Sequence, residues 1–102
     1  MSEKRVAFLV WENSVVISGK MHLLKGRAEG ETGAGKYIQF AVRQDGEWEG
    51  GMRRDFLTVR AYDEALRELI LAKKDGDDVT VHGTLRSSRG SGVNYVRCQS
   101  IK

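Results

Sequence analysis

Three segments of the chain alternate apolar and polar residues with a period of two, which is typical of strands buried on one face. In the middle one, Leu57, Val59 and Ala61 fall on one face, and polar or aromatic residues fall on the other. Each segment is therefore predicted to be a strand with one inner face. The three segments are 36–43, 55–62 and 79–86.

Two further strands are predicted with less regular patterns. Segment 14–21 is an apolar run interrupted by Gly19, and a glycine inside a strand marks a bulge or a sharp bend, as at a barrel corner. In segment 93–101 the alternation points Cys98 inward, where it is a small core residue, and Tyr95 outward. Segment 6–11 is also rich in β-forming residues and is either an added strand or an upstream extension of the first one.

One segment breaks the strand pattern. Residues 63–74 place their apolar side chains at helical spacing, with Asp63 as the N-cap, two lysines in the last turn and Gly76 as the stop. The strands are joined by three Gly-rich segments, which are predicted to be hairpin tips. These segments are 25–35, 44–54 and 87–92.

The order of elements indicates the fold class. Five strands with one helix between the third and the fourth, in 102 residues, are typical of the five-stranded Greek-key OB barrel. A plain β-sandwich would more often lack the helix. We therefore predict a single OB-fold domain over 1–102, all-β apart from one helix, with 1–12 as an N-terminal extension or an added strand.

Composition excludes several classes of protein. A single cysteine forbids an internal disulfide, and with only two histidines beside it no zinc ligand set exists. No segment has the length of a secretory signal or a membrane span. We therefore expect a reduced, metal-free, cytoplasmic protein that needs no cofactor and contacts no membrane. The net charge of +3 permits nucleic-acid binding without requiring it.

The sequence contains no recognisable catalytic site. Segment 30–37 resembles a phosphate-binding loop, but Tyr37 stands where that loop needs Ser or Thr, and a strand follows instead of a helix. Neither His22 nor His82 lies in a nucleophile signature. We therefore expect a non-enzymatic protein with no catalytic residues, and a hairpin tip at 30–37.

The outward faces of the middle strands suggest a ligand. Tyr37, Arg43, Phe56 and Arg60 share a surface that the alternation assigns to solvent. Aromatic rings interleaved with arginine suit single-stranded nucleic acid, because bases stack on rings and phosphates pair with guanidinium groups. An alternative is that Phe56 packs under a loop or a partner subunit. Further candidates lie in or beside the loops: Trp48, Arg86, Arg89 and, on the last strand, Tyr95.

Several blocks of this sequence, in this order, resemble the bacterial single-stranded DNA-binding protein family. The similar blocks cover nearly the whole chain from residue 13. The most specific is the last, in which a helix leads into a tight turn and the strand that follows it. The blocks are NSVVISGK at 13–20, FAV at 40–42, DFLTVRAY at 55–62, KDG at 74–76 and VTVHGTLR at 79–86.

The resemblance implies an OB fold, oligomers built largely through the first strand, and sequence-tolerant binding of single strands. By position, Phe56 matches a base-stacking aromatic and Trp48 lies near a second one, while Arg60, Arg86 and Arg89 fall on or near elements that face DNA. The chain departs from the family in three ways. It has an aromatic-free loop at 87–92, a longer start, and an end at Lys102 without a Gly-rich linker or acidic tail, so partner enzymes are not expected to be recruited by such a tail.

These observations favour a single-stranded DNA-binding protein that acts in replication, recombination or repair as a dimer or tetramer. The alternative is an OB-fold interaction module, a primosomal-type dimer or adaptor, with weak or no nucleic-acid binding. The modest net charge and the acidic residues at 47, 49 and 75–78 are consistent with that alternative. The predicted DNA contacts are Phe56, Trp48, Arg60, Tyr37, Arg43, Arg86, Arg89 and Tyr95.

Overall fold

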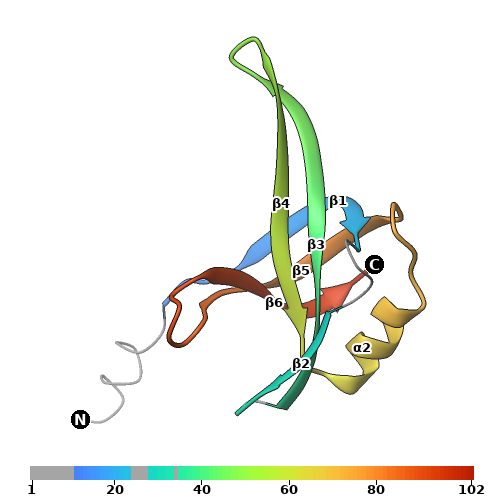
Figure 1. Cartoon of the computed structure of the whole chain (residues 1–102), viewed down its shortest axis with the longest axis vertical. Coiled ribbons are helices and arrows are strands. Elements are labelled where there is room, and N and C mark those ends of the chain that lie inside the picture. The colour runs from blue at the N-terminus through green and yellow to red at the C-terminus, as the bar shows by residue number, and fades with distance from the viewer. Residues whose placement is uncertain (1–10, 24–27, 34) are drawn as a thin grey trace.

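The computed structural model describes residues 11–23, 28–33 and 35–102, and it is drawn in Figure 1. The strand expected at 6–11 lies outside the described residues except for Trp11, which belongs to no strand. No helix among the described residues is long and apolar enough to cross a membrane. The elements are β1 (Val15–His22), β2 (Ala28–Thr32), β3 (Gly35–Trp48), β4 (Gly51–Ala61), α2 (Glu64–Leu71), β5 (Asp78–Ser87) and β6 (Asn94–Ile101).

The strands form one sheet in the order β1-β5-β6-β4-β3-β2, and a short pairing between β1 and β3 closes it into a barrel (Figure 1). Every pairing is antiparallel except that of β4 with β6. All five predicted strands are present. The predicted helix lies between β4 and β5, as the sequence indicated, and β2 adds a sixth strand.

The prediction that 44–54 is a loop was wrong. The pairing of β3 with β4 continues through this segment from Gln44↔Asp55 to Trp48↔Gly51, and only Glu49 and Gly50 form the turn. Both turn residues have positive φ, 51° and 81°, as a two-residue hairpin turn requires. The far halves of β3 and β4 therefore project from the barrel as a two-stranded arm (Figure 1), here called the arm (44–55).

The prediction of a loop at 25–35 was wrong in the same way, because residues 28–32 form β2 and pair with β3. Neither this segment nor the arm carries an alternating apolar face, since neither lies against the core. The sequence pattern therefore gave no strand signal there. Backbone pairing holds these ribbons instead, and it places residues of opposite charge, such as Glu31 and Lys36, opposite each other.

The core fills the barrel, and α2 packs at one end of it. Ile70 is the fully buried residue of α2, and the Asp63 carboxylate caps the helix by accepting hydrogen bonds from the backbone N–H groups of Ala65 and Leu66, at 2.9 and 3.2 Å. The helix ends at Leu71, earlier than the predicted 74. Buried core residues of the barrel include Met21, Ile38, Phe40, Val42, Val59, Ala61, Val79, Val81, Val96, Cys98 and Ile101.

Two glycines allow neighbouring strands to approach closely. A Cβ atom at Gly19 would clash with the carbonyl oxygen of Arg43, and one at Gly83 would clash with the carbonyl oxygen of Arg97. Gly19 lies next to the short β1–β3 pairing that closes the barrel. Gly83 lies at the irregularity in the β5–β6 register, between His82 and Gly83. Both positions therefore need glycine for lack of space.

Candidate nucleic-acid interface

The register of β3 and β4 places the predicted outward residues on one face of the sheet. Gln39 lies opposite Arg60, and Arg43 lies opposite Phe56. Since side chains alternate between faces, Tyr37 belongs to the same face as these four residues. This surface extends from the barrel to the base of the arm.

Arg60 lies between two tyrosine rings. Its guanidinium carbon is 4.7 Å from the centroid of the Tyr37 ring and 4.4 Å from that of Tyr95, so it forms a cation–π contact with each. Its Nε also donates a hydrogen bond of 2.9 Å to Oε1 of Gln39. Three side chains from β3 and β6 thus hold one guanidinium group in a defined position on β4. The structure therefore brings together three predicted contact residues from three strands.

Tyr62 and Arg97 extend this cluster, and the sequence analysis did not select them. The Tyr62 ring lies 5.4 Å from that of Tyr37, and the guanidinium carbon of Arg97 lies 4.6 Å from the Tyr62 centroid. Both residues follow the same alternation as Arg60 and Tyr95. Their outward position was therefore available from the sequence, but their contacts depend on the parallel pairing of β4 with β6, which the sequence does not reveal.

The environment of the Tyr62 phenol is polar and positively charged. Burial raises the pKa of this group, but side-chain hydrogen bonds with Thr32, Tyr95 and Arg60, together with the positive charge of Arg60, outweigh that effect. The pKa of Tyr62 therefore lies below its usual value. The same interactions tie the edge strand β2, through Thr32, to the cluster.

A groove opens beside this cluster, between the end of β2 and the β5–β6 loop. It has a volume of about 490 Å³, within the range of ligand-binding clefts. Among the described residues, four arginines and no carboxylate line it, so this lining has a strongly positive charge. Predicted contacts Arg86 and Arg89 lie in this lining. The lining residues are Thr32, Gly33, Arg60, Tyr62, Arg86, Ser87, Ser88, Arg89, Tyr95 and Arg97.

Phe56 and Arg43 lie apart from the groove, at the base of the arm. The Phe56 side chain is 50% exposed, and its ring centroid is 4.7 Å from that of His22 on β1. Tyr37 and Tyr95 each present a ring face to Arg60, whereas Phe56 keeps half of its surface open to solvent. Phe56 is therefore the better placed of these aromatics for stacking on a base. Trp48 ends β3 at the tip of the arm, and its side chain is not described.

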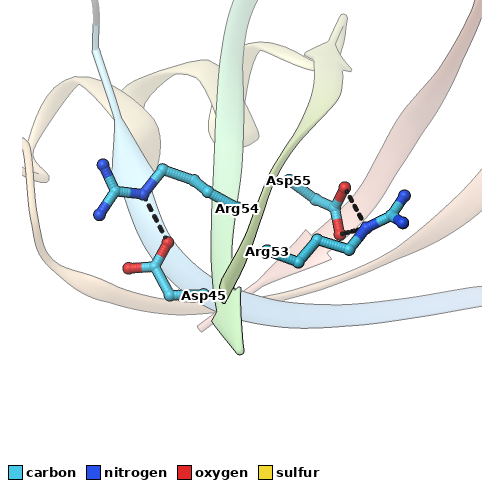
Figure 2. Close-up of polar contacts among 4 residues, drawn as sticks. All are labelled: Asp45, Arg53, Arg54 and Asp55. Atoms are coloured by element: carbon cyan, nitrogen blue, oxygen red, sulfur yellow. Dashed lines mark hydrogen bonds and ion pairs between the residues drawn. The ribbon is translucent and has the colours of Figure 1, made fainter. Parts of the chain in front are cut away.

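Ion pairs lie on both faces of the arm (Figure 2). On the face of Phe56, the carboxylate of Asp45 accepts a hydrogen bond of 2.8 Å from Nε of Arg54. The same carboxylate lies 3.3 Å from Nε of Arg43, which the figure does not draw. On the opposite face, Nε of Arg53 donates to both oxygens of Asp55 at 3.2 Å. The arm thus pairs its arginines with its own acids, whereas the described lining of the groove places no acid beside its arginines.

Cys98 belongs to the core, as predicted. Its side chain is buried, and burial raises the pKa of the thiol to about 11. Its Sγ donates a hydrogen bond of 3.4 Å to the carbonyl oxygen of Ser100. The thiol is therefore protonated near neutral pH, where a thiolate would be needed for reactivity.

Comparisons with solved structures identify the fold of this chain. No family model and no curated protein matches the sequence. Among solved structures, a small single-stranded DNA-binding protein from Streptomyces coelicolor matches with a TM-score of 0.70, at 16% identity, over 91% of this chain and 94% of its own. The fold is the OB fold. The fold that the sequence resemblance implied is therefore confirmed.

Two other OB-fold structures show the range of similar proteins. The single-stranded DNA-binding protein of Plasmodium falciparum, solved with single-stranded DNA, matches with a TM-score of 0.69 at 15% identity, over 91% of this chain and 93% of its own. The dimeric N-terminal domain of PriB from Thermoanaerobacter tencongensis matches with a TM-score of 0.68 at 20% identity, over 88% and 93%. Single-stranded DNA-binding proteins and a dimeric PriB domain are thus both similar to this chain in fold.

Proposed function

We propose that this OB-fold protein binds single-stranded DNA without sequence preference and acts in replication, recombination or repair. The observation that carries the proposal is the groove lined by four arginines, with no carboxylate among its described lining residues, on the same surface as the exposed ring of Phe56. Guanidinium groups meet phosphates whatever the sequence, and every base has a face that stacks on an aromatic ring. Structural neighbours that bind single-stranded DNA support the same assignment.

Titration with oligothymidine, followed by tryptophan fluorescence, tests this function. We expect saturable binding that weakens with salt, with log K falling against log[salt] at a slope of about −3 if the four groove arginines each neutralise a phosphate. Phe56→Ala should weaken binding by about 1 kcal/mol, near the lower end for a stacked base because His22 already covers part of the ring.

The same titration separates this function from that of an adaptor. An adaptor that uses the aromatic face to bind protein would show no saturable binding even at low salt, and light scattering would show no change on adding oligonucleotide. If Phe56→Ala lowers the melting temperature strongly and leaves affinity unchanged, Phe56 is a structural residue and the proposed stacking role is wrong.

We also propose that the protein forms a homo-oligomer through β1. Among the described residues, Lys20, Met21 and His22 of β1 pair with β3, and the carbonyl oxygen of Ser18 accepts a hydrogen bond of 2.9 Å from Nε2 of Gln44. On that side the backbone of 15–17 lies outside the described sheet pairing. Val16, within this stretch, is 60% exposed. An open strand edge with an apolar side chain is a ready site for pairing with another strand, here β1 of a second copy.

Light scattering at about 50 µM protein tests the oligomer. We expect a mass of at least two chains for the wild type and a shift toward one chain for Val16→Asp, because a carboxylate buried without a partner is strongly unfavourable. Val93→Asp is the control, since Val93 is equally exposed, at 62%, and lies beside β6 rather than on β1. A wild-type monomer, or equal effects of both substitutions, would overturn this proposal.

A further inference from the structure

The acidic residue on the binding face of the arm needs an explanation. Asp45 lies opposite Arg54, and Arg43, two residues before it, lies opposite Phe56. These four side chains therefore share one face of the ribbon, the face that the proposed function assigns to the DNA. A carboxylate on that face opposes phosphate, and yet it contacts two of the arginines that are available to bind phosphate there.

The contacts of Asp45 place it between the two guanidinium groups. Nε of Arg54 donates to one carboxylate oxygen at 2.8 Å, and Nε of Arg43 lies 3.3 Å from the other. The three side chains together carry one net positive charge instead of two. Asp45 and Arg43 are each about one-third exposed, so solvent screens the cluster only in part.

We infer that Asp45 is a specificity-determining residue that lowers the affinity of the arm for phosphate alone. Its carboxylate competes with phosphate for Arg43 and Arg54, so a ligand that offers only charge gains little from the arm. A single strand gains in addition from stacking on Phe56, which a duplex does not offer because its bases are paired and stacked already. The inference rests on the proposed function, since it requires that this face of the arm contacts the strand.

The variant Asp45→Asn tests the inference, because it removes the charge and keeps the size. For oligothymidine we expect an affinity about threefold to tenfold higher at 50 mM salt, and a salt slope steeper by about 0.7, the value for one more neutralised phosphate on a single strand. A duplex of equal length should gain affinity by a larger factor, so that the preference for the single strand falls. An equal gain for both ligands would overturn the role of Asp45 in specificity. Near 1 M salt the variant and the wild type should bind alike.

Asp55→Asn is the matched control. It removes the same charge at a neighbouring position in the arm, but Asp55 pairs with Arg53 on the opposite face (Figure 2). We expect it to leave the affinity and the slope close to wild type. If the two variants increase binding equally, the effect is one of net charge and the inference is wrong.

The remaining outcomes separate this inference from the proposed function. If the wild type binds oligothymidine with the expected salt slope and Asp45→Asn changes neither affinity nor slope, the arm does not contact phosphate and only the role of Asp45 is overturned. If the wild type shows no saturable binding, the proposed function itself is wrong. The melting temperature of each variant, compared with the wild type, shows whether a change in binding comes from a folded protein.

Discussion

Replacing Arg60 with alanine is expected to weaken oligothymidine binding by about 10-fold to 100-fold at low salt. A hydrogen bond to a charged group contributes about 1.5–3 kcal/mol, and each 1.4 kcal/mol is a factor of ten. Arg60 is held by two tyrosine rings and Gln39, so its guanidinium group loses little conformational freedom when it meets a phosphate. The substitution also removes one contact of Tyr37 and one of Tyr95, although each ring keeps its contact with Tyr62.

Two further variants sharpen this experiment. Arg60→Lys keeps the charge but loses the planar group that stacks between the rings, so we expect an intermediate loss of affinity. Arg53→Ala removes the same charge from the far face of the arm and should leave affinity within about threefold of wild type. If Arg60→Ala and Arg53→Ala weaken binding equally, the position of Arg60 in the stack has no importance for the ligand.

Replacing Gly83 with alanine is expected to destabilise the protein by about 3 kcal/mol. A Cβ atom there would meet the carbonyl group of Arg97 and the side chain of Val96. Overpacking of a well-packed site costs about 1–3 kcal/mol, and the upper value applies because the obstacle is backbone that cannot rotate away. For a protein of this size the melting temperature should fall by more than about 10 °C.

Thermal unfolding followed by circular dichroism measures this effect, with Gly46→Ala as the control. Gly46 also lies in a strand, but a Cβ atom there has nothing within 4 Å, so its replacement should change stability by less than about 0.5 kcal/mol. If Gly83→Ala melts within a few degrees of the wild type, β5 and β6 have room to separate and the close approach described here is not required.

The sequence predicts the elements that touch the core much better than those that leave it. Alternation identified β5, β6 and the barrel halves of β3 and β4 because each buries side chains on one face, and the apolar run around Gly19 identified β1. Asp63 and the helical spacing after it located α2. The arm and β2 bury no apolar face, so the same rule assigned them to loops. In the arm, β3 pairs with β4, and on its other side β3 pairs with β2. A local sequence pattern does not show which strands pair.

In the candidate site, too, the sequence predicted some features and not others. Tyr37, Phe56, Arg60 and Tyr95 were selected because they alternate outward, and the structure places them on that surface. The sandwich around Arg60 and the additional contacts of Tyr62 and Arg97 depend on β6 lying beside β4. The pairing of Asp45 with two arginines depends on the arm being a strand ribbon. Such contacts between distant segments require the topology, which one sequence does not supply.

The closure of the barrel and the base of the arm share one residue. His22 pairs with Ala41 where β1 meets β3, and its ring also contacts Phe56. A ligand that moved the Phe56 ring would change a contact of the closure, so binding and closure would be linked: each would change the equilibrium of the other by the same free energy. The barrel would then take part in the binding equilibrium as well as support the surface.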